Sequence, residues 1–384
     1  MTMNAFITGA YDTAVGELPG SSVLGLHAEA ARGAVRDAGL RLRDIDGVIC
    51  SYAFTLPHLM LGSVVSEYLG LHPTFCTAVS AGGASACVMV MQAAALVASG
   101  QCEHVLCITG ENRLTGLSRD GAVAALTAVG HPEFERPFGI SVPAAYALVA
   151  QRYLYETGAT STDLAAIAVA MRRHATRHPK AHMRTPIGID DVLTSKPIAT
   201  PLRLLDCCLV SDGGAAVVVS SRAAARDTQG TPVEVLGAGQ GHTHEHIVAA
   251  PSLTHFGCAR SAALAFGRAG VTPADIDVAE IYDSFTVTLA VELESIGFFA
   301  HGEAGAAAAR GDLDRDGRLP CNTHGGLLSY GHSGTAGGMF HVVEAVHQLR
   351  GRAELRQVAD ARLAFVHGDG GILSAHCSLV LGVH

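Results

Sequence analysis

Residues 38–46 read Ala-Gly-Leu-Arg-Leu-Arg-Asp-Ile-Asp, and residues 269–277 read Ala-Gly-Val-Thr-Pro-Ala-Asp-Ile-Asp. The two stretches lie 231 residues apart at both their Ala-Gly and their Asp-Ile-Asp positions. Later landmarks recur in the same order. Gly83 is followed by a helix-like segment and Gly100, and in the second half Gly334 is followed by a helix-like segment and Gly351. This self-similarity indicates a tandem duplication, in which two halves of one architecture pack together. We therefore expect a first half at 1–225, with an inserted loop region at about 112–205, and a second half at 230–384.

Hydrophobic periodicity within the halves alternates between strand-like and helix-like segments. Buried strands are predicted at Ala5–Tyr11, Gly47–Ser51, Thr74–Val79, His104–Thr109, Gly213–Ser221 and Leu363–His367. Helices are predicted at His27–Ala38, Leu59–Leu69, Ala84–Ala98, Val142–Glu156 and Met339–Leu349. Such alternation is typical of an α/β fold, and it predicts a largely parallel sheet with helices on both faces. Strand ends from both halves should meet at a central ligand-binding cleft.

Composition narrows the class of protein. The 384 residues carry a formal net charge of −9 and only 16% charged residues, so no basic surface for nucleic acid is expected. Met1–Ala10 lacks the pattern of a leader peptide, and no apolar run reaches membrane-spanning length, so we expect a cytoplasmic protein with no membrane partner. The ten cysteines form no CxxC pair, which argues against disulfides and zinc fingers.

The stretch Asn322–Gly338 is the most unusual part of the second half. It contains six glycines together with His324, Tyr330 and His332, and it leads directly into a predicted helix. Glycine permits positive φ and a close approach of ligand to the main chain, so a Gly-rich turn that opens a helix suits an anion or oxyanion site. The alternative is a flexible loop with incidental polar residues.

Two other polar segments are candidates for ligand binding. Arg172, Arg173 and Lys180 belong to the one concentrated run of positive charge, which suits the phosphates of a nucleotide-like ligand such as coenzyme A or is simply a solvated helix face. The alternating histidines of 242–246 have metal-ligand side chains but no fourth ligand in view. We expect no metal there, and interpret the segment as a loop at the substrate entrance.

Several motifs make the whole chain resemble the thiolase superfamily, in particular the branch of sterol-carrier-type thiolases and bacterial lipid-transfer thiolase-like proteins. They are Pro201–Cys208 with Asp212-Gly213, Tyr282–Thr286, Asn322–Gly326, Gly331-His332 and Gln348–Gly351. The resemblance implies duplicated βαβαβαββ halves in a five-layer αβαβα fold, a homodimer and an acyl-coenzyme A substrate with no other cofactor. It also implies a possible partner, a small OB-fold and zinc-ribbon subunit that helps bind the acyl-coenzyme A.

Departures from the family pattern concern the two thiols of a thiolase. The position of the nucleophilic cysteine falls on Gly83, which cannot be acylated, and the second cysteine position corresponds to His367. Cys87, one turn along the same predicted helix, is the alternative nucleophile, and Ser85 lies between the two. Without the thiols, what remains resembles an enolate-stabilising pocket, with its turns and oxyanion groups at Gly82, Gly83, His324 and Gly370.

The remaining candidates resemble a thiolase-like group that cleaves hydroxyacyl-coenzyme A esters of steroid side chains by retro-aldol chemistry. His332 matches the thiolase histidine that holds the thioester oxygen, and Tyr282 and Tyr330 match the tyrosines of that group. The leading hypothesis is an aldolase in which Tyr330 is the base and Tyr282 the acid, or the reverse. A thiolase with a displaced nucleophile and a non-catalytic acyl-coenzyme A-binding subunit stay open as alternatives.

Overall fold

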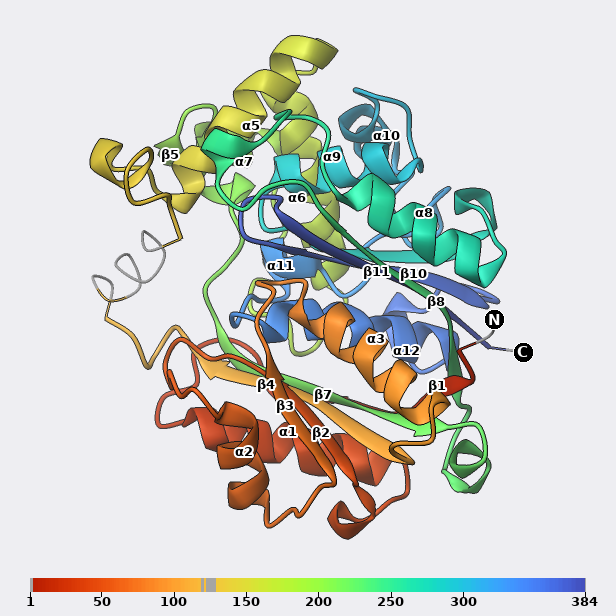
Figure 1. The fold of residues 1–384 in the computed structure, drawn as a ribbon. Coiled ribbons are helices and arrows are strands. Elements are labelled where there is room, and N and C mark those ends of the chain that lie inside the picture. Colours follow the sequence, from red (N-terminus) through yellow and green to blue (C-terminus); the bar gives the residue numbers. More distant parts are fainter. Residues whose placement is uncertain (1–2, 119–120, 122–128, 384) are drawn as a thin grey trace.

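The computed structural model describes residues 3–118, 121 and 129–383, and arranges them in five layers. In Figure 1, helices α1 and α2 cover the outer face of one sheet, helices α3 and α12 lie between the two sheets, and α8 and α9 cover the outer face of the other sheet. The prediction of a five-layer αβαβα arrangement is thus confirmed. None of the helices formed by the described residues is long and apolar enough to cross a bilayer.

The first half supplies five strands and three helices of these layers. Its strands, in sheet order, are β3 (Phe75–Val79), β2 (Gly47–Ser51), β4 (His104–Asn112), β7 (Asp212–Ser221) and β1 (Ala5–Asp12). Its helices are α1 (Val23–Asp37), α2 (Leu61–Leu69) and the central α3 (Ser85–Ala98). Ser22 begins α1 by accepting a hydrogen bond from the Gly25 amide, and Gly70 ends α2 in the left-handed conformation, as helix-capping residues do.

The second half repeats this plan with four strands. Its strands, in sheet order, are β8 (Val233–His242), β11 (Ala375–Gly382), β10 (Leu363–Gly370) and β9 (Val278–Ile281). Its helices are α8 (Cys258–Ala269), α9 (Thr286–Ile296), α10 (Ala304–Arg310), the short α11 (Gly326–Ser329) and the central α12 (Ala336–Leu349). Strands β1 and β8 pair at only two positions, which joins the two sheets at one corner.

The prediction of a largely parallel sheet is wrong. Parallel pairing is restricted to β2 with β3, β2 with β4, and β9 with β10. Antiparallel pairing joins β4 with β7, β7 with β1, β1 with β8, β8 with β11, and β11 with β10. The last strand of each half, β7 and β11, returns antiparallel to its neighbours, so only the strands linked through helices run parallel.

The repeated Asp-Ile-Asp stretch has the same local structure in both halves. Asp44 ends the one-turn helix η1 (Leu42–Asp44) and accepts from the Arg41 amide, as Asp275 of η6 (Pro273–Asp275) accepts from the Thr272 amide. The second aspartate of each stretch anchors the start of a neighbouring strand. Asp46 accepts from the amides of Glu103 and His104, and Asp277 accepts from those of Arg362 and Leu363.

The insertion packs over the second half. It contains α5 (Val142–Thr157), α6 (Ser161–Ala175), α7 (Ile189–Thr194) and the small hairpin β5 (Pro197–Ala199) with β6 (Leu202–Arg203), while part of it lies outside the described residues. Short 3-10 turns occur at Arg136–Phe138, Leu204–Asp206, Ala224–Asp227, Ile247–Ala249 and Glu354–Arg356. The predicted division of the halves at 225–230 begins within the turn Ala224–Asp227 and ends before β8, and it stays a prediction.

His27 on α1 predicts a pH dependence of stability. Burial lowers its pKa to about 4, and its Nδ1 lies 2.8 Å from the Val23 carbonyl oxygen. Because the unfolded chain takes up a proton near pH 6.5 and the folded chain does not, the contribution is full above pH 6.5 and is lost as the pH falls toward 4. The loss from this residue should reach about 3 kcal/mol.

Chemical denaturation of the wild type and of His27→Gln between pH 7 and pH 4 measures this effect. The stability difference between the two proteins should change with pH in that window. Glu29→Gln, at an exposed position of the same helix, is the control and should parallel the wild type. Parallel curves for His27→Gln and the wild type would contradict the assignment.

Candidate active site

A cleft of about 250 Å³ opens between the two halves. Gly82, Gly83 and Arg113 line it from the first half, and Tyr282, His332 and Asp369 line it from the second. The predicted meeting of both halves at one ligand-binding cleft is therefore present in the structure. The turn that leads into α3 lies on one wall, with Gly82 and Gly83 lining the cleft just before the helix begins.

Tyr282, His332 and Cys208 form a hydrogen-bonded row along this cleft. The Tyr282 hydroxyl lies 3.0 Å from His332 Nε2, and the Cys208 Sγ lies 3.1 Å from His332 Nδ1. Tyr282 immediately follows β9, and its neighbour Asp283 accepts hydrogen bonds from the Leu327 and Leu328 amides of α11. This contact ties the strand end that carries Tyr282 to the segment that leads to His332.

The electrostatic environment keeps this row neutral. Burial, assisted by the Arg113 charge, lowers the pKa of His332 to about 3, so the imidazole is uncharged at neutral pH. Burial also raises the pKa of Tyr282 well above its usual value, so the phenol keeps its proton. A neutral imidazole has one nitrogen lone pair to accept from a phenol, and the pair can pass a proton to or from a substrate oxygen.

Gly83 and Tyr282 are complementary in shape. A Cβ placed on Gly83 would lie 2.1 Å from Tyr282 Cζ, 2.3 Å from its hydroxyl oxygen and 2.3 Å from the Asp369 carbonyl oxygen. The phenol therefore occupies the space that a side chain at the start of α3 would need. A cysteine at position 83 and a tyrosine at position 282 exclude one another in this geometry.

Cys87 and Ser85, the other candidates for a nucleophile, do not line the cleft. Cys87 is fully buried in the core between the sheets, and burial raises the pKa of its thiol to about 12. The Ser85 hydroxyl donates to the Gly82 carbonyl and accepts from the Ala81 amide. Both side chains are thus used in packing the start of α3.

Cys87→Ala is expected to keep turnover within about threefold of the wild type, because the thiol is protonated and out of reach of the cleft. It should lose about 1 kcal/mol of stability from the small cavity that it leaves. Steady-state kinetics and mass spectrometry of the protein quenched during turnover check this. Loss of turnover together with a trapped acyl group on Cys87 in the wild type would restore the displaced-nucleophile alternative.

Tyr330 is separated from Tyr282 and His332. Its hydroxyl donates to Asp12, its ring packs against His178, His324 and Phe340, and the side chain is only 1% exposed. It does not line the cleft, so the geometry gives no support to its prediction as the base. The reason is local, because Gly331 at φ +156° turns the chain between Tyr330 and His332.

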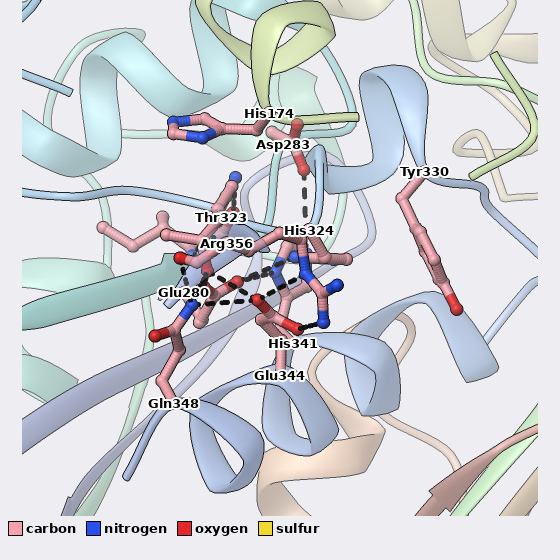
Figure 2. Close-up of polar contacts among 12 residues, drawn as sticks. His174, Glu280, Asp283, Thr323, His324, Tyr330, His341, Glu344, Gln348 and Arg356 are labelled. Atoms are coloured by element: carbon pink, nitrogen blue, oxygen red, sulfur yellow. Dashed lines mark hydrogen bonds and ion pairs between the residues drawn. The ribbon is translucent and has the colours of Figure 1, made fainter. Parts of the chain in front are cut away.

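His324 likewise lies outside the cleft, in the buried polar cluster shown in Figure 2. Its Nδ1 lies 3.0 Å from a carboxylate oxygen of Glu280, and this charge raises the histidine pKa against the effect of burial. Arg356 pairs with Glu344 nearby at 2.9 Å. These groups contact one another beneath α12, so the geometry gives no support to the predicted oxyanion role of His324, which stays a prediction.

The other predicted site residues divide in the same way. Gly370 lines the cleft beside Asp369, whereas His367 is fully buried and does not line it. Arg172 donates to Ser329 Oγ and to the Thr185 carbonyl, Arg173 pairs with Asp314, and Lys180 pairs with Asp12. None of these three basic side chains lines the cleft, and their contacts are internal, so their role in coenzyme A binding stays a prediction without geometric support.

Three residues at the cleft were missed by sequence reasoning, namely Arg113, Cys208 and Asp369. Arg113 follows β4, and its charge acts on both Tyr282 and His332. Asp369 lies two residues after His367 on β10, and the Tyr146 hydroxyl donates to its Oδ2 at 2.9 Å. The pattern His367-Gly-Asp-Gly-Gly contained the signal, because Asp369 stands between glycines at a strand end.

Comparison with known proteins decides the family. Residues 5–223 match the family described as thiolase, N-terminal domain, and residues 239–383 match the thiolase C-terminal domain-like family. The chain belongs to the thiolase superfamily. The fold class and the family resemblance inferred from the motifs are confirmed.

Relatives within the superfamily carry the names of carbon–carbon-cleaving enzymes. A steroid side-chain-cleaving aldolase of Thermomonospora curvata is 36% identical, over 98% of this chain and 97% of its own. A 17-hydroxy-3-oxo-4-pregnene-20-carboxyl-CoA lyase of Mycobacterium tuberculosis is 37% identical, over 98% of this chain and 99% of its own. The solved Ltp2-ChsH2(DUF35) aldolase aligns with a TM-score of 0.88 at 35% identity, covering 100% of this chain and 98% of that one.

Proposed function

We propose that this thiolase-superfamily protein catalyses retro-aldol cleavage of a 3-hydroxyacyl-coenzyme A thioester. The observation that carries the proposal is the Tyr282 phenol, which stands where a thiolase nucleophile would project and is hydrogen-bonded to His332. A site with a phenol and an imidazole at this position can move a proton but cannot form an acyl-enzyme through residue 83. The names of the relatives support the same reaction class.

In the proposed mechanism the Tyr282–His332 pair acts first as the base. The substrate β-hydroxyl gives its proton to the Tyr282 oxygen while the phenolic proton moves to His332 Nε2. The Cα–Cβ bond breaks, the β-carbon leaves as a ketone or aldehyde, and the electron pair passes into a thioester enolate. The same pair then returns the proton to the α-carbon, which yields the shortened acyl-coenzyme A.

The enolate oxygen needs hydrogen-bond donors in the cleft. We place it near the backbone amides of Gly83, at the start of α3, and of Gly370, with the helix end adding a favourable dipole. Donors of this kind supply about 3–4 kcal/mol of transition-state stabilisation in other enzymes. Tyr330, the base predicted from sequence, has no step in this mechanism.

The class of substrate follows from the lining of the cleft and from the relatives. Apolar side chains such as Phe54, Val142 and Phe285 line the cleft, which suits an apolar acyl group, and two relatives are named for steroid substrates. We therefore propose a polycyclic, steroid-type side-chain thioester as the substrate class. The test is product analysis by mass spectrometry with a 3-hydroxyacyl-coenzyme A of this type. Formation of a ketone and a shortened acyl-coenzyme A is expected, and intact substrate with bound protein would favour the non-catalytic alternative.

Acyl transfer through Cys208 is a second candidate, because its thiol lies 3.1 Å from His332 in the same cleft. A thiol beside an imidazole is the arrangement of a cysteine nucleophile. Burial raises its pKa to about 12, which disfavours the thiolate that such a reaction needs. Cys208→Ser separates the two functions. Cleavage should continue, because a serine hydroxyl still forms a hydrogen bond with His332. Acyl transfer should be lost, because the variant has no thiolate.

We also propose a homodimer that associates with a small acyl-coenzyme A-binding subunit. Strand β3 stands at one end of the nine-strand order, which leaves an edge on which two copies can pair. The solved aldolase compared above is named as a pair of Ltp2 with ChsH2(DUF35). Light scattering of the chain alone, and co-purification with a protein of the DUF35 class, test the two associations separately.

A further inference from the structure

A second group of polar side chains converges beneath the cleft, outside the proposed mechanism. His367 Nε2 and His376 Nδ1 lie 3.2 Å apart, on the neighbouring strands β10 and β11. Glu292 of α9 places its Oε1 3.5 Å from the first nitrogen and 3.8 Å from the second. Asp369 Oδ1 lies 3.9 Å from His376 Nδ1. Three possible ligand atoms from three elements, those of Glu292, His367 and His376, thus face a common point, and Asp369 lies at its edge.

The hydrogen bonds of His376 fix which of its nitrogens carries a lone pair. Its Nε2 lies 2.9 Å from the Leu373 carbonyl oxygen, which can only accept. Nε2 is therefore the protonated nitrogen, and Nδ1 presents its lone pair to the common point.

A chain of hydroxyls is compatible with the same state of His367. The Ser261 hydroxyl lies 3.0 Å from the Cys258 carbonyl oxygen and 2.9 Å from Ser378 Oγ, and when it donates to the carbonyl it accepts from Ser378. Ser378 then accepts from His367 Nδ1, 2.8 Å away, and the lone pair of His367 is on Nε2. In the reverse arrangement Ser378 donates to His367 Nδ1, and His367 Nε2 donates to His376 Nδ1. A metal ion at the common point requires the first arrangement.

The carboxyl groups of this cluster lack hydrogen-bond partners of their own. Both oxygens of Glu292, and Oδ1 of Asp369, are buried without a hydrogen-bond partner among the described residues. Burial and the Asp283 charge raise the pKa of Glu292, and no described cationic side chain counters them. Buried carboxylates in this state are unfavourable unless they take up protons or a positive charge occupies the common point.

We propose that Glu292, His367 and His376 bind one divalent first-row transition-metal ion, with Asp369 as a fourth ligand. Two imidazoles and two carboxylates suit Zn²⁺, whose tetrahedral bonds of about 2.0–2.1 Å separate the ligand atoms by about 3.3 Å. Each histidine already has its outer nitrogen held by a hydrogen bond, the arrangement usual for metal ligands. Asp369 borders the cleft, which gives the ion a path of entry.

A second Glu-His-His group in the described residues provides an internal contrast. Glu280, His324 and His341 also lie close together, but the Thr323 amide and hydroxyl both donate to Glu280. The Glu280 carboxylate also raises the pKa of the adjacent His324 against the effect of burial. The Glu280 carboxylate thus has partners within the protein, whereas that of Glu292 has none among the described residues. A metal is expected at the Glu292 group and not at the Glu280 group, so His341→Gln is a matched control.

The first experiment measures metal per chain by inductively coupled plasma mass spectrometry, on protein prepared without a polyhistidine tag. About one equivalent of metal is expected in the wild type as purified, or after chelator treatment and dialysis against Zn²⁺. Glu292→Gln should lower the content at least tenfold, while His341→Gln keeps it. Less than about 0.1 equivalent in the wild type after both treatments, or equal loss in both variants, would overturn the proposal.

The second experiment needs no variant. Co²⁺ added to the metal-free wild type should give the intense visible absorption of a four-coordinate ion at one equivalent, and Zn²⁺ should displace it and raise the unfolding temperature. Neither readout depends on turnover, so failure of the aldolase assay does not affect the result. Co²⁺ titration without visible bands and without a thermal shift would show that protons, and not a metal, occupy the common point.

Discussion

Tyr282→Phe is expected to lower kcat/KM for retro-aldol cleavage by about 10²–10⁴-fold, the range typical of losing a general acid–base group. The variant keeps the ring that fills the space beside Gly83 but removes the hydroxyl that bonds His332. Substrate binding should change little, so the loss should fall on kcat. Steady-state kinetics and a pH–rate profile measure it, with circular dichroism to show that the fold is intact.

Tyr330→Phe is the matched control, because it removes one phenolic oxygen from the same protein. Its hydroxyl bonds Asp12 in the buried core, so its loss should cost about 1–3 kcal/mol of stability. Turnover at a temperature where the variant is folded should stay within about threefold of the wild type. The opposite result would return the role of base to Tyr330. In that case Tyr330→Phe would have normal stability but no turnover, and Tyr282→Phe would be active.

Gly83→Ala is expected to lower both stability and activity, although it adds a single methyl group. That methyl would overlap the Tyr282 ring and the Asp369 carbonyl, each closer than 2.5 Å, and backbone cannot move aside as a flexible side chain can. Overpacking of this kind costs about 3 kcal/mol. Displacement of the phenol from His332 should lower kcat/KM by at least about 10²-fold. Thermal unfolding and kinetics on the same preparation measure the two effects.

A double variant tests whether the clash is the cause. Adding Tyr282→Ala to Gly83→Ala removes the ring, so the double variant should lose less stability than the sum of the two single changes. Gly267→Ala is the control, since a methyl at this exposed position of α8 meets nothing within 4 Å and should stabilise the helix slightly. Additive effects at positions 83 and 282 would contradict the close approach.

The fold was largely predictable because its information is local and repeated. Apolar runs between turn residues placed β2 at Gly47–Ser51 without error, and the Asp-Ile-Asp repeat revealed the two halves. Strand direction was not predictable in the same way. Hydrophobic periodicity does not indicate the direction in which a strand runs. The long insertion before β7 also concealed that this strand pairs antiparallel with β4.

The candidate site was predictable only where its residues share a motif. Tyr282 and His332 were found because each stands in a recognisable stretch, and the structure brings their side chains into contact. Tyr330 was grouped with His332 because the two are close in sequence, but the structure separates their side chains across Gly331, and the catalytic role of Tyr330 stays a prediction without geometric support. Cys208 and Asp369 reach the cleft from segments more than 150 residues apart, and no local pattern records that meeting.

The protonated thiols of Cys208, which lines the cleft, and of Cys87, which lies in the core, affect how the enzyme responds to oxidants. Oxidants attack thiolates far faster than thiols, and the pKa values of Cys87 and Cys208 are both raised to about 12. A thiolase with an exposed thiolate is inactivated when peroxide or a disulfide modifies that group. A mechanism based on a phenol and an imidazole presents no such target, so this active site should continue to turn over under oxidative stress.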